Sequence, residues 1–114
     1  MNEYAVLITT NKPAHLVKLD GTLAAYQNAV DGYIEIVSMY GLNADYVMII
    51  NEEGKLKHLP LNRTATAIYD NPIDCIVGAA LIVKRGEEDI ELMSKSEAEE
   101  ILETVQKYER TTRR

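Results

Sequence analysis

The run Tyr46–Ile50 constrains the fold more than any other part of the chain. Every residue in it is apolar or aromatic, and Val47, Ile49 and Ile50 are β-branched. A strand with one face in water alternates apolar and polar residues, whereas a continuously apolar strand is typical of one buried on both faces. The run therefore predicts a central strand of a sheet whose two faces are both covered.

Other apolar and β-branched runs predict the remaining strands. Tyr4–Thr10 and Ala14–Leu19 lie at hairpin distance, and Tyr33–Tyr40 and Ile73–Lys84 are each expected to form a strand. Lys55–Leu59 is expected to form a hairpin strand after a tight Glu-Glu-Gly turn. Residues 61–71 show the least pattern, and we expect a long connection there that holds one helical turn.

Two segments have helical spacing. Leu23, Tyr26 and Val30 follow Thr22, whose hydroxyl suits an N-cap, and Gly32 is expected to end this short helix in the left-handed conformation. Near the C-terminus, a serine cap at position 94 or 96 precedes an amphipathic pattern. Its apolar stripe consists of Ala98, Ile101, Leu102, Val105 and Tyr108.

These elements predict one α+β domain over residues 1–114. We expect an antiparallel or mixed sheet of about five strands, one short helix and a longer C-terminal helix. Residues 1–92 would form the core, 93–110 the amphipathic helix and 111–114 a flexible tail. A chain of 114 residues can bury a single core, which agrees with this division.

Composition excludes several classes of function. The net charge is −6 and no lysine or arginine stripe exists, so direct nucleic-acid binding is not expected. The longest apolar run, Cys75–Val83, is far shorter than the roughly 20 residues that span a bilayer. Cys75 is the single cysteine and no signal peptide is evident, so we expect a cytoplasmic protein without membrane association.

Short motifs in a fixed order carry a resemblance to a known family. They are Asp20-Gly21-Thr22-Leu23, Val30, Gly32-Tyr33-Ile34-Glu35, Asn51-Glu52-Glu53-Gly54-Lys55-Leu56, Leu59-Pro60-x-Asn62-Arg63 and Ile76-Val77-Gly78-x-Ala80. With these motifs the chain resembles the family catalogued as domain of unknown function 3846, over roughly its first three quarters. Members are carried largely by phages, plasmids and conjugative elements, so the resemblance implies a mobile-element origin. It implies no particular activity.

Asn62 and Arg63 are the main candidate ligand-binding residues. Arginine offers a rigid fork of donors that matches phosphate or carboxylate, and the neighbouring amide can both donate and accept. Tyr33 could stack on a base while Arg63 holds a phosphate, which would require the two side chains to share one cleft. The alternative is that Arg63 only ties its loop to Glu35 or Glu52 by a structural ion pair.

Carboxylates supply the remaining candidates. Glu35 could be a partly buried base, and Asn51 and Glu52 could present oxygen atoms to a ligand, although adjacent carboxylates on a turn usually face water. His15 and His58 lack partners at metal-ligand spacing, and Cys75 has no histidine near it in the sequence. We therefore expect no metal, no cofactor and no catalytic residue.

These patterns lead to three hypotheses. The first is a non-catalytic accessory protein of a phage or plasmid, expected to form a homo-oligomer, that counters host defence by sequestering a small nucleotide or by occluding a defence protein. The second is a small nucleotide-processing hydrolase that uses Glu35 or Glu52 with Arg63. The third is a structural or regulatory module that binds its partner through the C-terminal helix.

Overall fold

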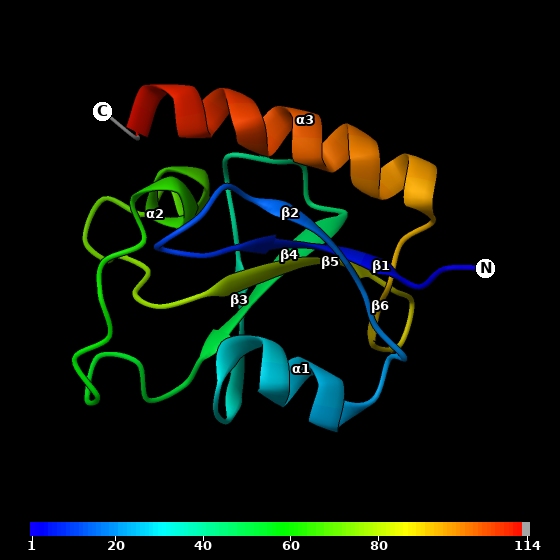
Figure 1. Ribbon diagram of the computed structural model, residues 1–114, viewed down its shortest axis with the longest axis horizontal. Helices are drawn as coiled ribbons and strands as arrows, with labels where there is room; N and C mark the ends of the chain where they lie inside the picture. The colour runs from blue at the N-terminus through cyan, green and yellow to red at the C-terminus, as the bar shows by residue number, and fades with distance from the viewer. Residues whose placement is uncertain (113–114) are drawn as a thin grey trace.

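The protein folds into a central sheet with helices on both faces, and the computed structural model describes residues 1–112 (Figure 1). Helix α1 covers one face, and helices α2 and α3 cover the other. The elements in chain order are β1 (Tyr4–Ile8), β2 (His15–Lys18), α1 (Leu23–Val30), β3 (Ile34–Ser38), β4 (Tyr46–Asn51), α2 (Arg63–Tyr69), β5 (Ala80–Arg85), β6 (Ile90–Glu91) and α3 (Lys95–Thr112). This architecture confirms the predicted α+β class with its long C-terminal helix.

The sheet is antiparallel throughout. Its strands run in the order β2-β1-β5-β4-β3, and the short β6 pairs with the end of β5. Strands β2 and β3 therefore form the two edges. The predicted hairpin of β1 and β2 is confirmed, with Val6 opposite Leu16.

Strand β4 lies in the interior of the sheet, between β5 and β3, and has the double burial that its sequence predicts. Val47 and Ile49 face α1 with Leu81 of β5, whereas Met48 faces α2 and α3 with Ile82. Each of these side chains is at most 2 % exposed. Because consecutive residues of a strand point to opposite faces, a continuously apolar strand contributes to two cores at once.

Helix α1 begins as predicted and ends differently. Thr22 caps it by accepting a hydrogen bond from the Ala25 amide at 3.2 Å. The left-handed residue at its end is Asp31, with φ 59°, and not Gly32 as predicted. Gly32 is required for another reason, because a Cβ there would lie 2.6 Å from Nδ2 of Asn51. The glycine thus allows a close approach between the helix end and β4.

The prediction of a hairpin strand at Lys55–Leu59 was wrong. Residues 52–58 form consecutive turns, in which the Lys57 amide donates to the Glu53 carbonyl at 2.9 Å and the Leu59 amide donates to the Gly54 carbonyl at 3.0 Å. Gly54 is buried next to Val77. The segment folds back on itself, and residues 52–58 form no strand of the sheet.

Two further boundaries differ from the predictions. Residues 61–71 contain helix α2, which is longer than the single turn expected there. The strand expected at Ile73–Lys84 begins only at Ala80, after an isolated bridge at Val77. Gly78 separates the two with φ 75°, a left-handed conformation that cannot continue a strand.

Helix α3 packs on the core of the same chain. Ser94 caps it by accepting from the Glu97 amide at 3.1 Å, and Ala98, Ile101 and Val105 of the predicted stripe are buried. The helix runs to Thr112, so the expected tail begins no earlier than residue 113, which with 114 lies outside the described residues. None of the helices within residues 1–112 is both long enough and apolar enough to cross a membrane.

Candidate functional site

The six candidate residues are distributed over three surface hollows. Asn62 and Arg63 line a hollow of about 210 Å³, and Tyr33 lines another of about 280 Å³. Glu35, Asn51 and Glu52 line a third, of about 180 Å³. Drug-sized ligands occupy sites of roughly 300–1,000 Å³. Each of the three hollows is smaller than that range.

Asn51 connects the end of β4 to the end of α1. Its side chain is 4 % exposed, and Nδ2 donates to the carbonyls of Val30 and Asp31, both at 3.1 Å. Oδ1 accepts from the Glu53 amide at 2.8 Å. Both ends of this amide are thus engaged within the fold.

Asn62 connects three segments that are far apart in the sequence. It is 2 % exposed, and Nδ2 donates to the carbonyls of Ile8 at 2.9 Å and Gly78 at 2.8 Å. Oδ1 accepts from the Ala65 amide at 3.0 Å and so caps α2. This asparagine joins β1, α2 and the segment before β5, and its amide groups point into the fold.

Arg63 is the first residue of α2 and its side chain is exposed. Its hollow is lined mostly by threonines, among them Thr9, Thr64 and Thr112. Within residues 1–112 no hydrogen bond or ion pair to the guanidinium is present, so the predicted alternative of a pair with Glu35 or Glu52 is not seen.

Tyr33 lies on a different part of the surface from Arg63. Its ring is 64 % exposed, just before β3, in a hollow shared with Asp31 and Lys57. Arg63 instead sits beside Thr9 and Thr10, which follow β1. The structure therefore does not combine the arginine fork and the tyrosine ring in one cleft, as a joint nucleotide site would require.

The third hollow brings together the largest number of candidates, and we call it the Lys55 hollow. It lies between β3, the turns after β4 and the loop that follows α2. Its lining consists of Glu35, Val37, Ile50, Asn51, Glu52, Lys55, Leu56, Tyr69, Asp74, Cys75, Ile76 and Val77. Glu35 is exposed on the sheet face that carries α2, opposite Ile50 in the ladder.

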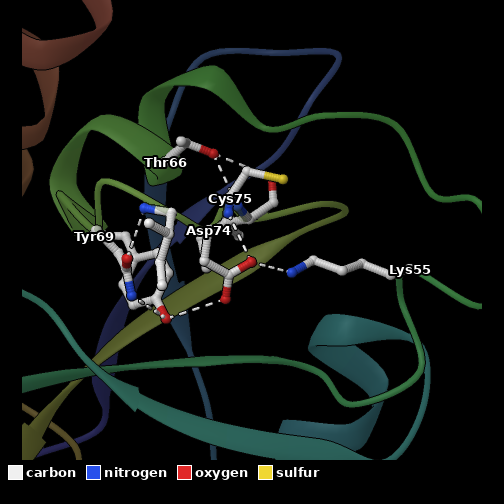
Figure 2. A network of polar contacts seen from close by, with 8 residues as sticks. Lys55, Thr66, Tyr69, Asp74 and Cys75 are labelled. Atoms are coloured by element: carbon white, nitrogen blue, oxygen red, sulfur yellow. Dashed lines mark hydrogen bonds and ion pairs between the residues drawn. The ribbon is translucent and has the colours of Figure 1, made fainter.

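A polar network joins several lining residues of the Lys55 hollow to one another and to α2 (Figure 2). The Lys55 ammonium group forms an ion pair with Asp74, and Tyr69 donates its hydroxyl to the same carboxylate at 3.4 Å. The Cys75 amide donates to Asp74 at 2.8 Å. Thr66 of α2 accepts from the Ile76 amide at 2.9 Å, which ties the loop to the helix.

This network fixes the charges of its two ionised members. The hydrogen bond from Lys55, helped by the Cys75 amide, lowers the pKa of Asp74. The same contact with Asp74 raises the pKa of Lys55. Lysine acts as a nucleophile or base only in its neutral form, which a raised pKa makes scarcer at neutral pH. The arrangement suits binding more than proton transfer.

Sequence reasoning found three residues of this hollow and missed its central pair. Lys55 is part of the Asn51–Leu56 motif, but the candidates chosen from that motif were Asn51 and Glu52. Asp74 lies in an irregular loop and had none, because the ion pair joins residues that only the fold brings together. No group of three or more histidine, cysteine, aspartate or glutamate residues that could hold a metal occurs within residues 1–112.

Two exposed apolar residues adjoin the members of the ion pair in the chain. Leu56 follows Lys55 and is 80 % exposed, and Ile73 precedes Asp74 and is 92 % exposed. We call Leu56 and Ile73 the apolar rim. Isolated apolar residues on a surface are normal, but here each of the two is next in the chain to one member of the same salt bridge, and Leu56 also lines the Lys55 hollow.

The comparison with known families decides the relationship of the chain. The model of the family described as "Domain of unknown function (DUF3846)" matches residues 1–106, which include every motif quoted for the resemblance. The chain belongs to this family. The match extends beyond the first three quarters and reaches far into α3. No curated protein and no solved structure matches the chain.

Proposed function

We propose that this DUF3846 protein is a non-catalytic accessory protein of a mobile element that counters host defence by binding and occluding a defence protein. The apolar rim supports this proposal more than any other feature, because Leu56 and Ile73 are highly exposed and each adjoins in the chain one member of the Lys55–Asp74 salt bridge. Protein interfaces combine such an apolar centre with polar surroundings. The mobile-element origin and the cytoplasmic setting rest on the family resemblance and on composition.

The small-nucleotide form of the hypothesis has less support. Arg63 and Tyr33 line different hollows, and the amides of Asn51 and Asn62 are engaged within the fold. A wider hollow of about 640 Å³ has room for a nucleotide. Its lining includes Glu3, Asp20 and Glu91, and carboxylates repel phosphate groups. Glu35 and Glu52, the alternative bases of the hydrolase hypothesis, are exposed and line a different hollow from Arg63.

A phage-plating assay tests the proposal. Bacteria that carry single defence systems would express the protein, and the plating efficiency of a sensitive phage would be measured on each. We expect the protein to restore plating against at least one system. The double variant Leu56→Glu/Ile73→Glu should lose that effect at least about tenfold, because charge at the centre of an apolar interface is strongly unfavourable.

Matched variants separate the hypotheses. Leu23→Glu/Leu61→Glu makes the same change at other exposed leucines, 57 % and 49 % exposed, and should retain activity. Arg63→Ala should also retain it. Loss of plating with Arg63→Ala, together with calorimetric binding of a cyclic or ADP-ribose-type nucleotide, would overturn occlusion in favour of sequestration. Chemical conversion of that nucleotide would instead support the hydrolase.

A further inference from the structure

Strand β3 forms an edge of the sheet that is unpaired within residues 1–112. The Glu52 amide donates to the Tyr33 carbonyl at 2.8 Å, in the same register that pairs Ile34 with Asn51. In an antiparallel ladder, hydrogen-bonded pairs alternate with pairs whose backbone groups point away. Residues 33, 35 and 37 therefore bond to β4, and the N–H and C=O groups of residues 34, 36 and 38 point outward.

The opposite side of β4 supports this assignment. The Arg85 amide donates to the Asp45 carbonyl at 2.6 Å, so odd-numbered residues of β4 bond to β5. The even-numbered residues then bond to β3, which agrees with the Glu52–Tyr33 bond. No hydrogen bond to the outward backbone groups of Ile34, Ile36 or Ser38 occurs in the described part of the chain.

This edge has little protection against pairing, since Glu35 is its one charged residue. Native edge strands often carry lysine, proline or a bulge. The other edge, β2, begins just after Pro13 and ends at Lys18, whereas β3 has neither residue type and its register is unbroken. Ile36 is 46 % exposed at its centre, and the flanking rings of Tyr33 and Tyr40 are 64 % and 72 % exposed.

We propose that β3 pairs with β3 of a second copy of this chain, antiparallel, with Ile36 opposite Ile36 at the two-fold axis. This register brings all the outward backbone groups of the edge into the ladder, because Ile34 then faces Ser38 of the other copy and Ser38 faces Ile34. The two sheets join into one across the axis. The inference goes beyond the proposed function and does not depend on the apolar rim.

The side chains of β3 favour the same register over the two registers that are shifted from it by one step. Glu35 faces Val37 of the second copy, so the two Glu35 carboxylates are not directly opposed. A slip that places Ile34 opposite Ile36 leaves both Ser38 residues unpaired and brings the two Glu35 side chains face to face, which is destabilising. A slip that places Ile36 opposite Ser38 leaves both Ile34 residues unpaired. A second copy fits because the strand is complementary to itself in one register.

Light scattering after gel filtration tests the proposal on the full chain. The protein should elute as a dimer, and Ile36→Lys should raise the dimer dissociation constant at least about tenfold, since two ammonium groups would meet at the axis. Leu23→Lys makes the same change at an exposed site on α1 and should leave the dimer intact. A wild-type protein that stays monomeric at tens of micromolar would overturn the proposal.

Cross-linking then tests the register. In a Cys75→Ser background, Ile36→Cys should link two copies under mild oxidation, because directly paired residues have Cα atoms about 5.5 Å apart, within the range of a disulfide. Glu35→Cys and Val37→Cys should not, because their copies would be offset by two residues, which adds about 7 Å along the strand. Preferential linking at position 35 or 37 would overturn this register. Linking at none of the three in a dimer would place the interface elsewhere.

Discussion

At the scale of single residues, the chain uses buried amides to join segments that are distant in the sequence. Asn51 and Asn62 both looked like ligand-binding residues, because they adjoin charged residues in the family motifs. In the structure each is less than 5 % exposed and makes three hydrogen bonds within the fold. A buried amide that satisfies several backbone groups is costly to remove, which gives these residues a structural role whatever the protein binds.

Asn62→Ala should lower the free energy of unfolding by about 2–4 kcal/mol. The variant loses the N-cap of α2, worth about 1 kcal/mol, and it takes away the buried donor that the carbonyls of Ile8 and Gly78 accept from. Urea denaturation measures the effect. Asn28→Ala, at an exposed position of α1, is the control and should change stability by less than about 0.5 kcal/mol. Equal effects of the two variants would contradict the assigned role.

At the scale of elements, a tyrosine at the start of β4 fixes the N-terminal end of α3. Tyr46 is 8 % exposed and donates its hydroxyl to Glu97 at 2.6 Å, and Lys84 lies 3.4 Å from the same carboxylate. Burial, with the Glu97 hydrogen bond second, raises the pKa of Tyr46 to about 12. The contact joins two elements that the sequence shows only as separate patterns.

Tyr46→Phe should cost about 1–2 kcal/mol at neutral pH, through loss of a hydrogen bond to a charged group. The folded pKa lies above the ordinary value of 10.0, so the neutral phenol stabilises the fold fully below pH 10. That contribution is lost as pH rises from 10 to about 12. Thermal unfolding across this range should therefore show a smaller loss of stability in Tyr46→Phe than in the wild type. Tyr40→Phe, at an exposed ring, should follow the wild type.

At the scale of the whole molecule, α3 belongs to the same hydrophobic core as the sheet. Ala98, Ile101 and Val105 pack in one cluster with residues of β1, β4 and β5. Tyr108 donates to the Gly41 carbonyl at 2.9 Å, and Glu109 accepts from the Ala14 amide at 2.8 Å. This packing leaves the apolar stripe of α3 covered by its own chain, so the hypothesis that the helix binds a partner through that stripe has little support.

Removal of residues 95–114 should unfold the domain, because it exposes the α2 and α3 side of the core. We expect loss of near-ultraviolet circular dichroism and of dispersed amide resonances in the truncated chain. A chain shortened only by Arg113 and Arg114 is the control and should keep both signals. A folded truncated domain would show that α3 is an appendage and would restore the partner-binding role of the helix.

The predictions from sequence succeeded where one local pattern determines the outcome. Tyr46–Ile50 gave a strand buried on both faces, and the stripe from Ala98 to Val105 gave an amphipathic helix, although the sequence left open whether that helix packs on its own domain or on a partner. They failed at Lys55–Leu59, where the preceding Glu-Glu-Gly turn suggested a hairpin strand but local turns satisfy the backbone, and at residues 61–71, where the cap on α2 was interpreted as a ligand site. A cap and a binding residue use the same amide groups, so their sequences look alike.

The sequence by itself determined the layers of this protein, because the period and continuity of apolar residues dictate which faces must be buried. Only the tertiary structure decided the surface. It separated Tyr33 from Arg63, joined Lys55 to Asp74, and left β3 at an edge, since each of these depends on the order of the strands and on loops whose ends are brought together by the core. The periodicity of apolar residues predicts which face of one helix or strand is buried. It does not indicate which helices and strands become neighbours.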